Sequence, residues 1–516
     1  MAAHCTVLAA ALVFLAIASR AVQSTPNIVL LFADDLGYGD LGCYGHPTSH
    51  SPNLDKMAAE GLRFTQFYSA SPVCSPSRAA LLTGRYQIRS GIWPGVFGAS
   101  STGGLPHNET TIAEGLKKVG YATGMVGKWH LGVGANNTYL PVNQGFDHYL
   151  GIPFSHDMCP CAICFYPNQS CFDGCRKGEA PCPLFMDNEI VQQPADLTTL
   201  TQRYTDAATG FIQKSAAAKT PFFLYMAYQH THHPQFAGQK FRNSTSRGTM
   251  GDSLIEMDDS VGQIFAALKA SGVDDNTFVF FTADNGPSLT RHVRGGNQGL
   301  LKCGKGTTYE GGQREPALAW MPGKIAAGQI THELAGTVDV LPTVFKLTGA
   351  EIPSDRIIDG VDMSSILFTE QGKAIRTHYF YYPKNPEPTI GLYGIRNNQY
   401  KAHFYTEGSH CGPPYRDEDC WSKTGQKKQD PPILFNLLID PSERYPISPK
   451  SDEYKTVMAE LNQTATEFSR TAVFRGSEIH GSSAALQPCC KPGCKPFPGC
   501  CVCNKLPYSA RTSPPW

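Results

Sequence analysis

Two apolar runs that end in carboxylate residues constrain the fold of this 516-residue chain more than any other feature. Residues 27–35 read NIVLLFADD, and residues 277–286 read TFVFFTADNG. Continuous apolar runs are typical of central strands in a parallel sheet, because helices cover both faces of such a sheet. A third run, PFFLYMAYQHTHHP at 221–234, ends in histidines instead. Since ligands of α/β sheets bind beyond the carboxyl ends of the strands, these polar endings mark the first candidate site.

Helix-like stretches alternate with these runs, at residues 51–62, 108–120 and 251–272. Strands that alternate with helices predict a doubly wound α/β sheet. After about residue 375 the pattern changes to short alternating segments, which predict a small antiparallel sheet, and a closing helix is expected near 452–469. We therefore expect a large N-terminal domain over 25–375 and a smaller C-terminal domain over 376–516 that ends in a cysteine-rich tail.

The charge balance excludes one class of partner. Lysine plus arginine and aspartate plus glutamate number 44 each, so the formal net charge is zero. A nucleic-acid binder normally carries a basic patch and net positive charge. The 41% hydrophobic and 17% charged composition predicts a folded chain with a sizeable core and argues against disorder.

The first segment is typical of a secretory signal. Residues 6–18 form an apolar run of thirteen, and a helix of that length spans about 20 Å, short of a hydrocarbon core of about 30 Å. We expect a signal peptide over 1–24, cleaved somewhere between residues 19 and 25, rather than an uncleaved anchor. No other stretch reaches eighteen apolar residues, so no transmembrane segment is expected in the mature chain.

Sequons and cysteines agree with a secreted glycoprotein. The five candidate glycosylation sites are Asn108, Asn136, Asn168, Asn243 and Asn462. Of 18 cysteines, 17 remain after Cys5 leaves with the signal, and most lie in two clusters over 159–182 and 489–503. The second cluster could also be interpreted as a zinc knuckle, but disulfides are expected in an oxidising compartment. The odd count leaves one cysteine without a partner.

Oxygen-bearing side chains at two strand ends predict a hard metal ion. The four candidates are Asp34, Asp35, Asp284 and Asn285. Carboxylate and amide oxygens without thiol or imidazole select Ca²⁺ or Mg²⁺ over zinc. Either pair alone could equally form a turn or a helix cap. Two pairs at the same edge of one sheet favour the metal site.

The segment Cys74-Ser75-Pro76-Ser77-Arg78, continued by AALLTGR to Arg85, is the most specific motif in the chain. It resembles the signature of the sulfatase family, Cys-x-Pro-x-Arg followed by a helix and Thr-Gly-Arg. The resemblance extends to DDLGYGDLGCYGHP, GKWHLG, HTHHPQF, TADNGP and CGKGTTYEGGQREPALAW. GGLP near residue 105, FSHD at 154–157 and the CCKPGC tail resemble the arylsulfatases within that family. The implied fold is a large, mostly parallel mixed sheet flanked by helices, as in alkaline phosphatase, with a smaller C-terminal antiparallel sheet.

The resemblance implies that Cys74 is oxidised to Cα-formylglycine (3-oxoalanine) by a formylglycine-generating enzyme. Hydration of the aldehyde yields a geminal diol, of which one hydroxyl attacks sulfur and the other, once deprotonated, expels sulfate. Covalent catalysis of this kind splits one difficult step into two. Conversion of Cys74 would leave 16 mature cysteines, an even number that is available for pairing.

The same resemblance implies roles for further residues. Asp34, Asp35, Asp284 and Asn285 would hold one Ca²⁺ per subunit, and Arg78 would hold the loop of the nucleophile. Lys128 and His130 would contact the diol, with His130 as the base for elimination. His232 and Lys305 would bind sulfate, one of them protonating the leaving oxygen, and Ser155 is a weaker sulfate-site candidate.

Four further residues lie within these motifs. His230 and His233 lie beside His232, so the choice of His232 rests on its place in the motif and not on spacing. For Cys303 the expectation is a disulfide to Cys411 or Cys420. Cys43 is expected to remain a buried thiol.

The leading interpretation is a lysosomal arylsulfatase that hydrolyses 3-O-sulfogalactosyl lipids such as cerebroside sulfate, or aryl sulfates, after targeting through the secretory pathway. A secreted enzyme is the alternative location. Alternative functions are a glycosaminoglycan sulfatase such as N-acetylgalactosamine-6-sulfatase, a phosphate or phosphonate ester hydrolase, and an inactive secreted glycoprotein that binds sulfated glycans. Expected partners are a lipid-presenting activator protein and further copies of the chain, in an association that depends on pH because sixteen histidines gain charge below about pH 6.5.

Overall fold

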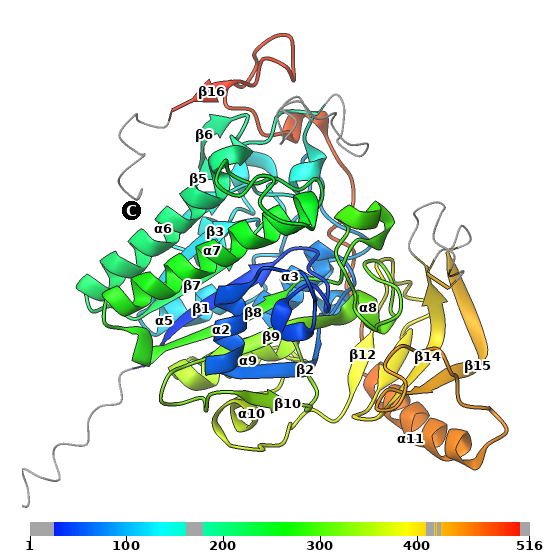
Figure 1. The fold of residues 1–516 in the computed structure, drawn as a ribbon. Helices are drawn as coiled ribbons and strands as arrows, with labels where there is room; N and C mark the ends of the chain where they lie inside the picture. Colours follow the sequence, from blue (N-terminus) through cyan, green and yellow to red (C-terminus); the bar gives the residue numbers. More distant parts are fainter. Residues whose placement is uncertain (1–24, 161–178, 409–416, 418, 421–424, 506–516) are drawn as a thin grey trace, which may run out of the picture.

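The computed structural model describes residues 25–160, 179–408, 417, 419–420 and 425–505. These residues form a twelve-stranded sheet flanked by helices and a separate four-stranded sheet nearer the C-terminus (Figure 1). The predicted α/β fold with a small antiparallel sheet is confirmed. The expected signal peptide over 1–24 lies outside the described residues.

The large sheet is parallel at its centre, from β8 to β4, and has antiparallel pairs on both sides of this centre, while the edge strand β10 again pairs in parallel with β2. Its strands lie in the order β10 (Gln329–Thr331), β2 (Leu62–Tyr68), β9 (Arg314–Trp320), β8 (Thr277–Ala283), β1 (Asn27–Ala33), β7 (Phe222–Ala227), β3 (Ala122–Gly127), β4 (His148–Gly151), β5 (Leu184–Met186), β6 (Glu189–Gln193) and β16 (Cys503–Asn504), with β11 (Ala335–Gly336) paired to β2. The three predicted apolar runs are the adjacent strands β8, β1 and β7, all parallel. Ala33 lies opposite Ala283, so the acids that follow both strands leave the sheet at the same edge.

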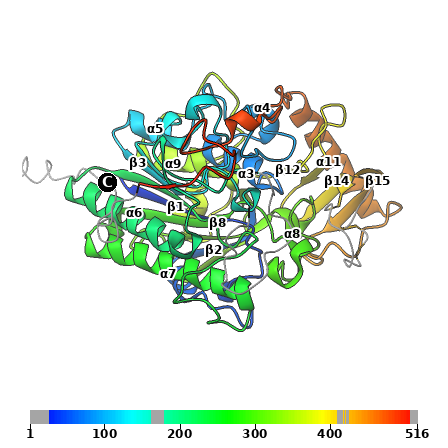
Figure 2. The same cartoon turned by 90° about the horizontal axis from the view of Figure 1, so that it is seen from above.

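Helices cover both faces of this sheet, as Figure 2 shows for α6 and α7 on one side and α3, α5 and α9 on the other. The helices of this part are α2 (Pro52–Glu60), α3 (Cys74–Thr83), α4 (Gln87–Ser90), α5 (Ile112–Lys118), α6 (Leu197–Ala217), α7 (Gly248–Ala270), α8 (Glu310–Gln313), α9 (Val340–Thr348) and α10 (Ser364–Phe368). Short 3₁₀ turns occur at Gly42–Tyr44, Ala135–Asn137, Pro141–Asn143, His156–Met158, Asp274–Asn276, Leu289–Arg294, Thr337–Asp339 and Ala484–Leu486. Helix α5 begins later than predicted because Thr111 and Glu114 form a capping box at its start.

The core lies between the central strands and these helices. Every residue of β1 is buried, which explains its uninterrupted apolar sequence. A close backbone approach occurs where β3 ends, immediately before Lys128. Gly127 has φ +110° there, and a Cβ atom on it would lie 1.8 Å from the carbonyl oxygen of Ala227. Only glycine fits this position.

The second sheet is antiparallel and packs against one long helix. Its strands are β12 (Tyr379–Tyr381), β13 (Gly394–Arg396), β14 (Tyr400–Glu407) and β15 (Gln426–Asn436), and the helix is α11 (Asp452–Ser469). The predicted helix near 452–469 is therefore confirmed. Ser451 caps α11 by accepting a hydrogen bond from the backbone N–H of Tyr454. Phe468 of α11 stacks on Phe380 of β12 with ring centroids 3.7 Å apart.

Buried ion pairs join the small sheet to the large one through α8. The Lys401 ammonium on β14 lies 2.9 Å from a Glu310 carboxylate oxygen and 2.7 Å from the Thr308 carbonyl oxygen. Glu443 accepts a hydrogen bond from the backbone N–H of Glu310 at 2.6 Å. A disulfide between Cys303 and Cys420 crosses the same boundary. The small sheet thus braces the segment just before and after Lys305.

The disulfide predictions are confirmed where the structure describes the cysteines concerned. The described disulfides are Cys159–Cys182, Cys303–Cys420, Cys489–Cys501, Cys490–Cys503 and Cys494–Cys500. The tail is therefore disulfide-bonded and not a zinc knuckle, while Cys411 and four cysteines of the first cluster lie outside the described residues. Cys43 and Cys74 are free. The prediction of a buried Cys43 is wrong, since it is only partly buried on a short surface turn.

The sequons lie at the surface where they are described. Asn108, Asn136, Asn243 and Asn462 are exposed, and Asn168 lies outside the described residues. Whether any of the five carries a glycan stays a prediction. Among the described helices, none combines the length and the apolar character that a membrane crossing would need.

A carboxyl group in the small sheet predicts how stability changes with pH. Burial raises the pKa of Glu407 to about 7, against the lowering effect of Lys384. Because this pKa lies above its value in the unfolded chain, the folded state binds more protons between about pH 4.5 and pH 7, and stability falls as pH rises through that range. We expect Glu407→Gln to melt close to the native protein at pH 5 and at a higher temperature at pH 8. Equal Tm differences at both values, measured by calorimetry, would contradict this.

Candidate active site

The acids at the two strand ends meet at one edge of the large sheet. The backbone N–H of Asp35, which follows β1, donates to Asp284 Oδ1 at 3.1 Å, just beyond β8. The Asn285 amide donates to Asp35 Oδ1 at 2.8 Å. Asp34 completes the group, and all four side chains are buried. The tertiary structure therefore brings together the four oxygen donors that the sequence predicted.

Cys74 lies at the first residue of α3 and faces these acids. Its sulfur is 3.6 Å from Asp34 Oδ1, 3.4 Å from Lys128 Nζ and 3.7 Å from Lys305 Nζ. Burial, reinforced by the charge of Asp284, raises the pKa of the thiol well above its usual value. A neutral thiol is a poor nucleophile, so Cys74 in its genetically encoded form lacks the depressed pKa of a catalytic cysteine.

Three cations balance the three carboxylates. Lys128 Nζ lies 2.5 Å from Asp34 Oδ2, and Lys305 Nζ lies 2.5 Å from Asp35 Oδ1. The Arg78 guanidinium donates to Asp284 Oδ2 at 2.7 Å and to the Lys128 carbonyl oxygen at 3.0 Å. Because the formal charges cancel, a divalent cation would leave the site with a net positive charge that suits an anionic ester.

The carboxylates differ in how well their charges are compensated. Burial alone would raise the pKa of Asp34, yet the positive charges of Lys128, Arg78 and Lys305 lower it to about 2. Burial raises the pKa of Asp35 to about 6. The positive charge of Lys305 opposes this rise, and the negative charges of Asp34 and Asp284 add to it. Asp35 is therefore the carboxylate that gains most from a further cation.

The oxygen atoms left without partners fit a hard metal ion. Asp35 Oδ2 and Asn285 Oδ1 are both buried and accept no hydrogen bond from the described residues, although His232 Nε2 lies 3.5 Å from the former. Buried acceptors of this kind are normally satisfied, and carboxylate and amide oxygens are the ligands that Ca²⁺ prefers. The residues present therefore fit a Ca²⁺ ion held by Asp34, Asp35, Asp284 and Asn285.

Of the three adjacent histidines, His232 is the one beside the acids. His230 instead lies 2.7 Å from Glu256 on α7. Burial lowers the pKa of His233, and the charges of Arg291 and His156 lower it further. Burial lowers the pKa of His232 well below its usual value, and the charge of Lys305 lowers it further. The motif-based choice of His232 agrees with this placement.

Two predicted residues stand at the margin of the cluster. The Nε2 atom of His130 lies 2.9 Å from the Phe97 carbonyl oxygen. Burial lowers the pKa of this ring, and the positive charges of Lys128 and Arg78 lower it further. Ser155 is buried at the start of a 3₁₀ turn. Its hydroxyl has no hydrogen-bond partner among the described residues.

Three non-glycine residues in or beside the site have positive φ values. Asp35, His130 and Cys303 have φ values of 56°, 60° and 60°. Residues other than glycine adopt this left-handed region rarely, and such positions tend to occur where function requires a particular side-chain direction.

Sequence reasoning missed residues that support His232. Burial alone would raise the pKa of Asp157, but the electrostatic interaction with His232 lowers it to about 2. The His156 ring lies 5.6 Å from the His232 ring, and its Nε2 atom is 2.8 Å from the Pro234 carbonyl oxygen. Both residues belong to FSHD, so the motif itself was a signal.

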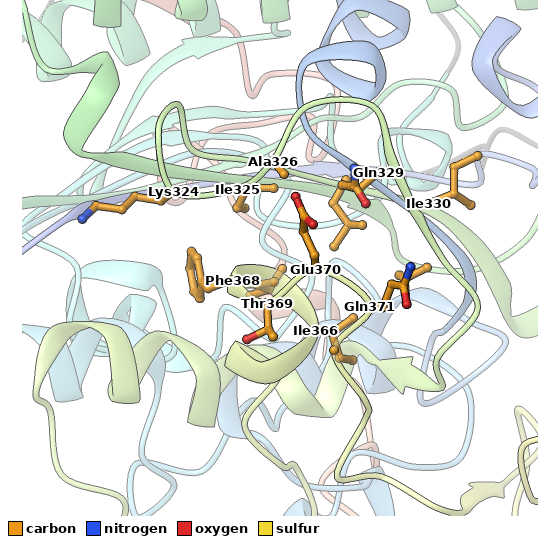
Figure 3. Close-up of a pocket in the computed structure, with 14 residues that line it drawn as sticks. Lys324, Ile325, Ala326, Gln329, Ile330, Ile366, Phe368, Thr369, Glu370 and Gln371 are labelled. Carbon is orange, nitrogen blue, oxygen red and sulfur yellow. The ribbon is translucent and has the colours of Figure 1, made fainter.

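A surface cavity of about 260 Å³ lies elsewhere, between β10 and α10. Figure 3 shows its lining, which includes Ile330, Phe368 and Glu370. Leu62 also lines it and is the first residue of β2, which runs in the same direction as β1. The cavity therefore lies at the opposite edge of the sheet from the acids and takes no part in the site.

Comparison with protein families decides the assignment. A model of the sulfatase family matches residues 26–350, and a model of the C-terminal region of aryl-sulfatase matches residues 375–503. The chain belongs to the sulfatase family. It is a sulfuric ester hydrolase by this membership, and sulfatases typically use formylglycine and a metal ion, for which the buried cluster of acids, Cys74 and His232 is suited.

Individual sulfatases are similar along most of the chain. Human (Homo sapiens) arylsulfatase A is 48% identical over 94% of this chain and 97% of its own length. N-acetylgalactosamine-6-sulfatase of Mus musculus is 40% identical over 92% of each chain. Among solved structures, the PsFucS1 sulfatase from Pseudoalteromonas sp. superposes with a TM-score of 0.74 at 28% identity, covering 89% of this chain and 92% of that one.

Proposed function

We propose that this sulfatase is a lysosomal arylsulfatase that hydrolyses the sulfate ester of 3-O-sulfogalactosyl lipids such as cerebroside sulfate. The observation that carries the proposal is the position of Cys74, at the start of α3 and between Lys128, Lys305 and Asp34. The lipid substrate is supported by the 48% identity to arylsulfatase A. The disulfides support a secretory route, with secretion from the cell as the alternative end point.

In the proposed reaction Cys74 would carry formylglycine, and Asp34, Asp35, Asp284 and Asn285 would hold one Ca²⁺ per subunit. Formylglycine at Cys74 would supply, as its hydrate, two geminal hydroxyls: one as the nucleophile toward sulfur, and one whose loss of a proton would allow sulfate to leave and the aldehyde to form again. Arg78 holds Asp284 and the Lys128 carbonyl in place. Lys128 and Lys305 bring two positive charges to the sulfate oxygens. His130 accepts the proton of the second hydroxyl, while His232 or Lys305 protonates the departing alcohol oxygen.

Mass spectrometry of the tryptic peptide over residues 64–78 tests this proposal. Cys74 is the only cysteine in that peptide, and formylglycine is about 18 Da lighter than cysteine. We expect the mass loss, trapping of the aldehyde by a hydrazine reagent, and release of inorganic sulfate from an aryl sulfate. An unmodified thiol in protein from a competent secretory host, together with no sulfate release, would favour the alternative of an inactive glycan-binding glycoprotein.

N-acetylgalactosamine-6-sulfatase is the second candidate, because a relative with that name is 40% identical. The two activities are separated by comparing kcat/KM on micellar cerebroside sulfate and on an oligosaccharide that ends in N-acetylgalactosamine 6-sulfate. We expect at least about a tenfold preference for the lipid, the range that differences in pocket contacts produce. A preference for the oligosaccharide would reverse the assignment.

The remaining partners follow from this proposal. A formylglycine-generating enzyme would modify Cys74 during maturation, and an activator protein would present the lipid. Self-association that changes with pH is also proposed. The division into a catalytic domain over 25–375 and a C-terminal domain over 376–516 stays a prediction.

A further inference from the structure

A chain of two hydrogen bonds links the residue after Cys74 to His130. The backbone N–H of Phe97 donates to Ser75 Oγ at 3.2 Å, and His130 Nε2 lies 2.9 Å from the Phe97 carbonyl oxygen. All three residues are buried, with exposures of 0%, 1% and 1% in the order Ser75, Phe97, His130. The peptide units on both sides of Phe97 are therefore held between the first turn of α3 and the His130 ring.

This arrangement selects one tautomer of His130. A carbonyl oxygen only accepts hydrogen bonds, so Nε2 must carry the proton that it donates to Phe97. In the neutral ring Nδ1 is then the nitrogen with a free lone pair. Nδ1 is buried and has no hydrogen-bond partner among the described residues, so nothing there competes for a proton brought by a reacting group.

The backbone of His130 fixes the direction of the ring from the other side. His130 has φ 60°, and its backbone N–H donates to the Pro153 carbonyl oxygen at 3.0 Å. With the main chain held there and Nε2 held by Phe97, the ring has little freedom to rotate. Ser75 is the side chain that ties Phe97 to the helix of the nucleophile.

We propose that Ser75 is a positioning residue that acts through the Phe97 backbone to hold His130 in the tautomer whose Nδ1 accepts the proton during sulfate release. The inference rests on the proposed function, because it takes His130 as the base. It assigns a role to the second position of Cys-Ser-Pro-Ser-Arg, and it identifies Nδ1 as the ring nitrogen that accepts the proton. The described hydrogen bond of the Ser75 hydroxyl is with the Phe97 backbone, so Ser75 would act on His130 only through Phe97.

The charges around His130 set how its protonation responds to pH. Burial lowers the pKa of His130, and the charges of Lys128 and Arg78 lower it further, whereas the Phe97 carbonyl and Asp284 favour the charged ring. A weaker contact to Phe97 removes one of the two favourable interactions and allows the other tautomer to form. A variant of Ser75 should therefore affect the proton-transfer step and leave substrate binding largely intact.

The test compares Ser75→Ala with Ser75→Thr, which restores a hydroxyl, and with Ser77→Ala as a matched control. Ser77 is also buried on the first turn of α3, and its hydroxyl has no hydrogen-bond partner among the described residues. Rates are expressed per aldehyde, because both serines lie in the modification motif. Loss of one hydrogen bond should lower kcat of Ser75→Ala about 5- to 10-fold with KM within about twofold, while the other two variants stay near the native rate.

A second readout is independent of activity. In the full chain labelled with ¹⁵N-histidine, the His130 signals are identified by their absence in His130→Asn. We expect one neutral tautomer, protonated at Nε2, in the native protein and in Ser77→Ala, and averaged nitrogen shifts in Ser75→Ala. Native shifts in Ser75→Ala, or an unchanged kcat per aldehyde, would overturn the inference even if the native chain hydrolyses sulfate esters. Failure of the proposed function would appear differently, as no aldehyde and no sulfate release from the native chain.

Discussion

Replacing Cys74 with alanine is expected to reduce sulfate ester hydrolysis by about 10⁴-fold or more, because it removes the group that forms the covalent bond to sulfur. The fold should survive, since the side chain is small and the surrounding ion pairs of Lys128 and Lys305 with Asp34 and Asp35 do not depend on sulfur. The measurement is the rate of sulfate release from an aryl sulfate, together with Tm of the secreted protein.

Cys43, the second free cysteine among the described residues, is the matched control. Cys43 lies on a short surface turn and is only partly buried, so Cys43→Ala should retain the native rate and the native aldehyde content. Near-native turnover by Cys74→Ala would show that the nucleophile is another residue. Loss of activity in both variants would mean that the effect comes from folding and not from the site.

Replacing Asp35 with asparagine is expected to remove the stabilising effect of Ca²⁺ and to lower activity at least about 100-fold. Asp35 Oδ2 is a buried oxygen without a hydrogen bond from the described residues, and the substitution takes one negative charge from the metal site. A ligand at 100 times its Kd stabilises a protein by about 2.7 kcal/mol. Calcium should therefore raise Tm of the native protein and leave Tm of Asp35→Asn unchanged.

Asp55→Asn provides the control for this experiment. Asp55 accepts a hydrogen bond from the backbone N–H of Cys43 and lies outside the metal cluster. Its variant should lose little activity and should keep the calcium-dependent rise in Tm. A calcium-dependent rise of native size in Asp35→Asn, measured by calorimetry with and without a chelator, would place the metal elsewhere.

The sequence alone was enough to predict the fold class and most of the residues that form the site. The strands β1, β7 and β8 were evident because a parallel strand covered on both faces must be apolar throughout. The acids that follow them were recognisable because ligands collect at the carboxyl ends of such strands. The signature around Cys74 supplied the remaining site residues through resemblance. The structure brings Arg78, Lys128, His232 and Lys305 to the acids that follow β1 and β8.

Three things were decided only by the tertiary structure. The first is the pairing of Cys303 with Cys420, and the second is the bracing of α8 by Lys401 and Glu443; both join segments that are far apart in the sequence. The third is the link from Ser75 through Phe97 to His130, which depends on backbone groups. Composition and periodicity report which faces of a strand or helix are buried. They cannot predict which backbone groups pair, because every residue carries a C=O acceptor and every residue other than proline also carries an N–H donor. Which of these groups meet, and therefore which nitrogen of His130 keeps its lone pair, depends on how the chain packs in three dimensions.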